Sequence, residues 1–112
     1  MKIKYLDKPT IMKAIRHLVE DLSQEYPKIE EIRLFGSLAR DEAVPGSDVD
    51  ILIVLTDSDL PFKDRAEKYM PPSFPVGIDV LPYTKPEIET MLDQGNHFLK
   101  SAMKDSILLF SR

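Results

Sequence analysis

The sequence contains no cysteine, which excludes disulfide frameworks, thiolate nucleophiles and cysteine-ligated metal sites. It also lacks a long apolar run, because the longest aliphatic stretch (51–55) is far shorter than the ~20 residues that a membrane helix requires. Residues 1–7 do not contain the apolar core of a signal peptide. We therefore expect a cytoplasmic protein without a membrane-spanning segment.

An excess of basic residues is absent as well. Fifteen Lys and Arg stand against nineteen Asp and Glu, so the net charge is -4. This balance argues against an extended nucleic-acid interface, which needs many cations facing phosphates. With 112 residues, of which 43% are apolar, the chain is long enough for one core, and we expect a single domain over 1–112.

The hydrophobic pattern predicts helices and strands that follow one another along the chain. An apolar stripe from Ile11 to Leu22 recurs at helical spacing, and Pro27 ends this predicted helix. The remaining pattern predicts strands over 29–35, 48–55, 76–81 and 107–110, with helical segments at 38–43, 61–70, from 86 and around 98–103. This order indicates an α+β fold, a small mixed β-sheet flanked by helices.

Two carboxylates, Asp48 and Asp50, open the most apolar predicted strand. Side chains at positions i and i+2 of a strand point to the same face, so both carboxylates project together. Adjacent anions repel each other unless water or a cation neutralises them. Hard divalent cations such as Mg²⁺ are the usual occupants of a site made only of oxygen atoms.

A third carboxylate, Asp79, lies inside the predicted strand over 76–81. An unpaired charge buried there would cost several kcal/mol, and the nearest cation along the chain is Lys85. If Asp79 faced Asp48 and Asp50 from a neighbouring strand, metal coordination would offset that cost. Three such carboxylates suit two cations spaced ~3.5–4 Å apart, an arrangement used for displacement at phosphorus.

The dipeptide Gly36-Ser37 follows the first predicted strand, and Asp48 begins the next. If these strands pair antiparallel, the end of one lies beside the start of the other. Glycine allows backbone N–H groups to approach a ligand closely, and the serine hydroxyl adds a donor. We therefore expect a phosphate-binding bend next to the carboxylates.

The spacing of Gly36-Ser37 and Asp48-Val49-Asp50 resembles the signature of the minimal nucleotidyltransferases, which are relatives of DNA polymerase β. Asp79 lies where that family has its third carboxylate, whereas Asp41 stands where many members have glycine. The resemblance extends roughly from 29 to 110, and it implies a polymerase-β-like nucleotidyltransferase fold. Further matching positions are Ala39, Arg40, Ala43, Ser47 and the apolar run 51–55.

The resemblance also implies roles for these residues. Asp48 and Asp50 would ligate two Mg²⁺ ions, while Asp79 would ligate the ion on the nucleophile side and help to take the acceptor proton. Gly36 and Ser37 would hold the β- and γ-phosphates of a nucleoside triphosphate, most often ATP, whose nucleoside monophosphate is transferred. For Ser47, contact with phosphate and stabilisation of the turn at 44–47 remain equal alternatives.

The acceptor is the open question at this stage. About 30 residues follow the third strand, too few for a separate substrate domain, so the acceptor must bind this domain, another copy or a partner chain. Stand-alone family members of this size are commonly antitoxins paired with helical HEPN-type toxins, and they attach AMP to a hydroxyl side chain of the toxin. The resemblance therefore favours a protein adenylyltransferase. The alternatives are an antitoxin that acts by binding alone and a small-molecule transferase acting on an aminoglycoside-like hydroxyl.

Overall fold

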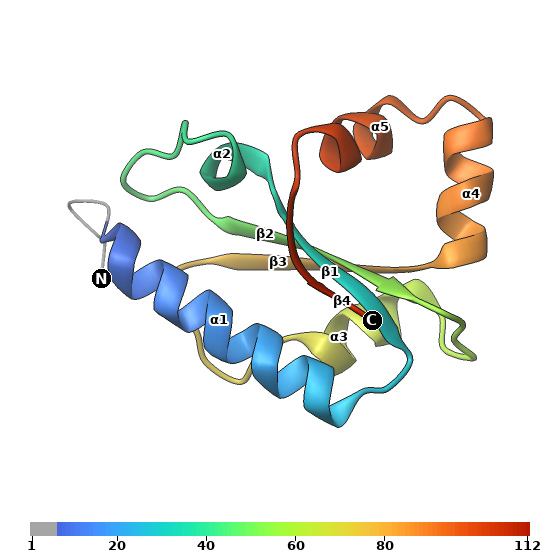
Figure 1. The fold of residues 1–112 in the computed structure, drawn as a ribbon, viewed down its shortest axis with the longest axis horizontal. Coiled ribbons are helices and arrows are strands. Elements are labelled where there is room, and N and C mark those ends of the chain that lie inside the picture. Colours follow the sequence, from blue (N-terminus) through green and yellow to red (C-terminus); the bar gives the residue numbers. More distant parts are fainter. Residues whose placement is uncertain (1–6) are drawn as a thin grey trace.

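A computed structural model describes residues 7–112 of the chain (Figure 1). Its elements follow the order predicted from the hydrophobic pattern. The helices are α1 (Lys8–Glu25), α2 (Gly36–Ala39), α3 (Phe62–Tyr69), α4 (Lys85–Asp93) and α5 (His97–Lys104). The strands are β1 (Ile29–Phe35), β2 (Val49–Leu55), β3 (Ile78–Thr84) and β4 (Ile107–Ser111).

The four strands form one mixed sheet in the order β3-β2-β1-β4. β1 is antiparallel to both of its neighbours, whereas β2 and β3 are parallel. The parallel pair requires a crossover connection, and α3 lies within it. The predicted α+β fold with a small mixed sheet is confirmed.

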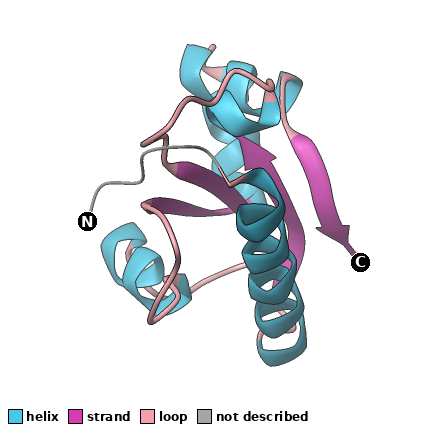
Figure 2. Cartoon of the chain, turned by 90° about the vertical axis from the view of Figure 1, so that its left-hand side faces the viewer, coloured by secondary structure: helices cyan, strands magenta, loops and turns pink. Residues whose placement is uncertain are grey.

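Helices cover both faces of the sheet, with α1 on one side and α4 and α5 on the other (Figures 1 and 2). Alternate residues of β2 therefore enter two separate cores. Ile51, Ile53 and Leu55 pack in the core that contains the apolar stripe of α1, and Leu52 and Val54 pack with residues of α4 and α5. Burial on both faces explains why β2 is the most apolar segment of the sequence.

The boundaries of β3 differ from the prediction, which placed this strand over 76–81. The strand begins at Ile78 and continues through Pro82 to Thr84. Proline is accepted here because β3 is an edge strand, where a missing N–H breaks no ladder on the outer side. Sequence alone did not distinguish an edge strand from a central one.

An ion pair between a buried arginine and a partly exposed glutamate joins α3, β3 and α4. Arg65 is only 4% exposed, and its guanidinium donates two hydrogen bonds to Glu87, at 2.7 and 2.9 Å. The same group donates to the carbonyl oxygens of Leu60 and Pro82, both at 2.9 Å. Glu87 also accepts a hydrogen bond from the backbone of Thr84, as part of a capping box that starts α4. The Arg65 guanidinium, with help from Thr84, lowers the pKa of Glu87 to about 2.

Within residues 7–112, none of the helices combines the length and apolar character needed to span a bilayer.

Candidate functional site

Asp50 and Asp79 are direct neighbours across the parallel strands β2 and β3. Asp50 lies two residues before Leu52, so it shares the sheet face on which α4 and α5 pack. The helices do not cover this end of the face, because Asp79 remains exposed and Asp50 is half-buried. The pKa of Asp50 is raised, first by burial and then by the negative charges of Asp79 and Asp48.

Asp48 immediately precedes β2, and its carboxylate lies against the backbone of Gly77. A Cβ atom on Gly77 would come within 2.1 Å of Oδ1 of Asp48. The backbone N–H of Val49 donates to the carbonyl of Gly77 at 2.9 Å, which fixes the two segments side by side. Gly77 therefore leaves the space that Asp48 occupies. This role of Gly77 was not predicted from the sequence, although an isolated glycine in a strand-like run is a signal of close backbone approach.

The Gly36-Ser37 bend lies against the same carboxylates. Phe35 pairs with Asp50 across the antiparallel strands β1 and β2, so the chain reaches Gly36 beside Asp50. Gly36 has a φ of +77°, in the left-handed region, and a Cβ atom there would come within 2.2 Å of Oδ2 of Asp50. Glycine is thus needed twice at this position, for the backbone angle and for the contact.

The two serines of the predicted site, Ser37 and Ser47, make different hydrogen bonds. Ser37 is the second residue of α2; its side chain is half-buried, and its backbone carbonyl accepts a hydrogen bond from the N–H of Glu42 at 2.8 Å. The hydroxyl of Ser47 accepts a hydrogen bond from the N–H of Val44 at 3.0 Å. Ser47 therefore stabilises the turn at 44–47, and its contact with phosphate stays a prediction.

Arg40 and Asp41 end the short helix α2. Arg40 donates to Glu42 at 3.2 Å, and its charge also opposes the rise in the pKa of Asp50. Asp41 has a φ of +57°, a left-handed conformation that glycine adopts at little cost, and its carboxylate forms an ion pair with Lys8. The lysine lowers the pKa of Asp41. Asp41 therefore connects the loop after α2 to the start of α1 at the protein surface.

The carboxylate oxygens of Asp48, Asp50 and Asp79 suit a hard divalent cation, although the three side chains do not converge on one point. Within the part of the chain that the structure describes, no three acidic or histidine side chains stand together in a ligating cluster. Asp50 and Asp79 nevertheless repel each other at close range, and a cation between them would relieve that repulsion. Asp48 and Asp79 are exposed, so both side chains are free to turn toward an ion. Carboxylate oxygen atoms are the ligands that Mg²⁺ prefers.

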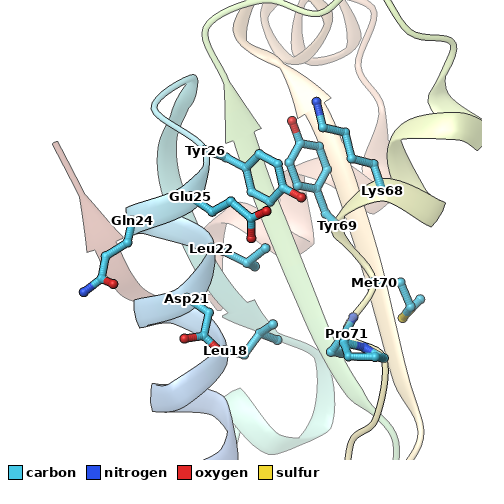
Figure 3. Close-up of a pocket in the computed structure, with 11 residues that line it drawn as sticks. Leu18, Asp21, Leu22, Gln24, Glu25, Tyr26, Lys68, Tyr69, Met70 and Pro71 are labelled. Atoms are coloured by element: carbon cyan, nitrogen blue, oxygen red, sulfur yellow. The ribbon is translucent and has the colours of Figure 1, made fainter.

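A separate cavity of about 560 Å³ lies between the end of α1, the end of α3 and the segment 70–72 (Figure 3). The rings of Tyr26 and Tyr69 meet edge to face there at 4.9 Å, and the ammonium of Lys68 lies 5.2 Å from the Tyr26 ring. None of the six residues of the predicted site lines this cavity. This cavity therefore does not coincide with the candidate site, which lies at an open end of the sheet.

Comparison with known proteins agrees with this geometry. The nucleotidyltransferase domain family matches residues 15–108, and the chain belongs to this family. No curated protein matches the sequence. The fold resembles that of a protein from Sulfolobus solfataricus described as a candidate nucleotidyltransferase, with a TM-score of 0.65, 24% identity, and coverage of 91% of this chain and 81% of that chain.

A second solved structure is a toxin-antitoxin with AMP-PNP. Its TM-score is 0.57 at 19% identity, with coverage of 87% of this chain and 73% of that chain. At these identities the two structural likenesses establish the shared fold. The family itself and the nucleotidyltransferase fold that the Gly-Ser and Asp-x-Asp spacing predicted are therefore confirmed.

Proposed function

We propose that this chain is a divalent-cation-dependent nucleotidyltransferase that moves AMP from ATP to a hydroxyl acceptor. The observation that carries the proposal is the pairing of Asp50 with Asp79 on adjacent strands, with Gly36 packed directly against Asp50. Membership in the nucleotidyltransferase domain family supports the reaction class. The choice of ATP is supported by the AMP-PNP in the toxin-antitoxin structure of similar fold.

In this proposal Asp48, Asp50 and Asp79 hold two Mg²⁺ ions next to the bound triphosphate. When bound, the ions neutralise phosphate charge and lower the pKa of the acceptor hydroxyl. Gly36 and Ser37 orient the β- and γ-phosphates with backbone N–H groups and the serine hydroxyl. The chain's own contribution is positioning and charge complementarity, which supply most of the rate in phosphoryl and nucleotidyl transfer.

The reaction balances as a single displacement. The acceptor oxygen forms a bond to the α-phosphorus, and the bond between that phosphorus and the bridging oxygen to the β-phosphate breaks. Pyrophosphate leaves with the bonding electrons. The acceptor proton passes to the carboxylate of Asp79, which is exposed and lies next to Asp50.

We further propose that the acceptor is a hydroxyl side chain of a partner toxin of the helical HEPN type, so that the chain acts as an antitoxin. The similarity to a toxin-antitoxin structure supports this choice. The open end of the sheet supports it too, because an exposed site admits a protein acceptor more readily than a closed pocket does.

The test is to incubate the chain with its co-encoded partner, Mg²⁺ and ATP labelled at the α- or at the γ-phosphate. We expect the α-label to appear on the partner and the γ-label to leave as pyrophosphate. The control Glu89→Gln changes one exposed charge on α4 and should leave labelling intact. Transfer of the γ-label instead would identify a kinase and overturn the proposal.

Two other outcomes would identify the alternative functions. If Asp48→Asn with Asp50→Asn abolished labelling but still neutralised the toxin fully, the chain would be an antitoxin that acts by binding. If hydroxylated small molecules were labelled and the partner was not, the chain would be a small-molecule transferase.

A further inference from the structure

Phe98, the second residue of α5, is exposed although it carries a large apolar side chain. It is 52% exposed, whereas the other four phenylalanines of the chain are buried or half-buried. The packing of α5 on the sheet does not depend on this ring, because Leu99 and Ala102 form the buried face of the helix. A single exposed apolar side chain is ordinary in itself, so the significance of Phe98 lies in its position.

Phe98 stands next to the candidate site, with one other ring between them. Its ring meets the ring of Phe35 edge to face, with the centroids 5.9 Å apart and an interplanar angle of 82°. Phe35 is only 7% exposed and pairs directly with Asp50 across β1 and β2. Directly opposed residues of an antiparallel pair project from the same face of the sheet. Phe98 therefore lies over the face that carries Asp50 and Asp79, beside the bend that begins at Gly36.

The contact with Phe35 leaves an aromatic face of Phe98 free. A ring has two faces, and an edge-to-face contact uses at most one of them. Because Phe35 is buried, it also supports the ring of Phe98 before any ligand binds, which lowers the entropic cost of binding. The surface presented to solvent is thus a flat aromatic ring without a polar group, which suits a planar aromatic ligand.

The charge of α5 suits a ligand that is also anionic. The helix contains Lys100 and Lys104 but no carboxylate, in a chain whose net charge is -4. A polyphosphate at the Gly36-Ser37 bend therefore meets no like charge from this helix. A planar aromatic group joined to a polyphosphate is the chemistry of a nucleoside triphosphate.

We propose that Phe98 binds the base of the nucleotide by stacking. This inference rests on the proposed function, in which Gly36 and Ser37 hold the β- and γ-phosphates and the α-phosphate lies beside Asp50. A single ribose separates the α-phosphate from the base, which then reaches the ring of Phe98. Stacking on an aromatic ring is open to every base, because each base has a π-face. Phenylalanine has no hydrogen-bonding group, so this contact alone does not distinguish adenine from guanine.

The test compares two ligands that differ in the presence of the base. One is an ATP analogue that cannot be cleaved between the α- and β-phosphates, and the other is inorganic tripolyphosphate. Both are titrated with Mg²⁺ present and followed by calorimetry. We expect Phe98→Ala to weaken binding of the ATP analogue about tenfold and to leave binding of tripolyphosphate unchanged.

Three further variants separate stacking from a structural effect. Phe98→Tyr keeps the ring and should bind both ligands as the wild type does. Phe98→Leu keeps much of the apolar volume without the ring and should behave like Phe98→Ala. Leu60→Ala truncates another exposed apolar side chain, in the segment that follows the other end of β2, and is the matched control.

Fluorescence gives a second measure. The triphosphate of 2-aminopurine riboside is a fluorescent nucleotide whose emission is quenched when its base stacks on a ring, and the chain contains no tryptophan that would add emission of its own. The quenching seen with the wild type should disappear in Phe98→Ala, at ligand concentrations that saturate both proteins. Thermal melting shows whether the variant is folded.

Each contrary result has a different meaning. If Phe98→Ala bound the ATP analogue as tightly as the wild type does, the inference would be wrong and the proposed function would stand. Equal weakening of both ligands would also overturn it, because Phe98 would then act on the phosphate-binding bend. Unchanged nucleotide binding with reduced labelling of the partner would assign the ring to the protein acceptor instead. A wild type that bound neither ligand would overturn the proposed function, and this inference with it.

Discussion

Asp50 and Asp79 lie opposite each other on parallel strands, and Gly36, which follows β1, lies directly against the carboxylate of Asp50. The arrangement concentrates negative charge at one end of the sheet and raises the pKa of Asp50. Without a ligand it is unfavourable for folding. The candidate site therefore reduces stability, as functional sites often do.

Asp50→Asn should stabilise the metal-free protein. The pKa of Asp50 is higher in the folded state than its ordinary value, so stability from this group falls as pH rises through the range above 3.8. At neutral pH we expect the free energy of unfolding to increase in the presence of EDTA, by less than about 1 kcal/mol because solvent screens this half-buried carboxylate. Urea unfolding of both proteins measures this difference, which should vanish at low pH. Glu89→Gln provides the control for charge alone, and a destabilised Asp50→Asn at pH 7 would contradict the account.

Substitution of three glycines separates backbone strain from crowding of the carboxylates. Gly36→Ala introduces both, whereas Gly46→Ala introduces strain alone, because Gly46 has a φ of +91° and no atom within 4 Å of its added Cβ. Gly77→Ala introduces a contact with Asp48 at a position without a positive φ. We expect Gly46→Ala to lose about 1 kcal/mol of stability and keep its activity.

Gly36→Ala and Gly77→Ala should lower transferase activity at least about tenfold, since each displaces a carboxylate from its place in the site. Activity assays and thermal melts on the same preparations measure both effects. If Gly46→Ala lost as much activity as Gly36→Ala, the contact with Asp50 would not be the important feature.

The Arg65–Glu87 pair should make the fold sensitive to acid. The pKa of Glu87 is about 2 in the folded protein against an ordinary value of 4.5, so its contribution is complete above 4.5 and is lost as pH falls toward 2. Since the Glu87 side chain is 41% exposed, solvent screening limits this contribution to about 1–2 kcal/mol. Glu87→Gln should remove the corresponding part of the pH dependence of unfolding.

Arg65→Met tests the buried side of the same pair. It leaves the carbonyls of Leu60 and Pro82 without their donor, and we expect a loss of about 3 kcal/mol or more. Lys28→Met is the matched control, because Lys28 pairs with Asp57 at 2.6 Å on the exposed surface and should matter by less than about 1 kcal/mol. Similar losses in the two variants would show that burial of Arg65 is not what makes its pair important.

Asp41→Gly should tolerate the left-handed backbone better than Asp41→Ala does. The φ of +57° costs a residue with a side chain about 1 kcal/mol, and the exposed ion pair with Lys8 contributes little. We therefore expect Asp41→Gly to be more stable than Asp41→Ala by about 1 kcal/mol in urea unfolding. Equal stability of the two variants would contradict the left-handed backbone conformation of Asp41.

Local patterns in the sequence were sufficient for most of the fold. The expected neighbours Gly36, Asp50 and Asp79 lie close together, although within residues 7–112 the three carboxylates do not form a ligating cluster. The apolar run after Asp50 predicted a central strand, which follows from short-range periodicity. Antiparallel pairing with the strand before Gly36 was a condition for the expected phosphate-binding bend, and the structure meets that condition. The role of Asp79 as a neighbour of Asp50 required only that its strand lie beside β2.

Features that depend on distant partners were not predicted. The pattern over 61–70 predicted a helix without singling out Arg65, which is buried where Glu87, far along the chain, meets it. β3 continued through Pro82 because the strand lies at an edge, a fact set by the order of the whole sheet. Gly77 acquired its importance only through contact with Asp48.

The central claim is that Asp48, Asp50 and Asp79 hold divalent cations at the nucleotide. Binding of Mn²⁺ in the presence of a non-hydrolysable ATP analogue, followed by electron paramagnetic resonance, tests it most directly. We predict that the wild type binds close to two ions per chain and that Asp79→Asn loses the ion on the acceptor side while retaining the one held with the triphosphate. Unchanged stoichiometry and affinity in Asp79→Asn and Asp50→Asn would contradict the account.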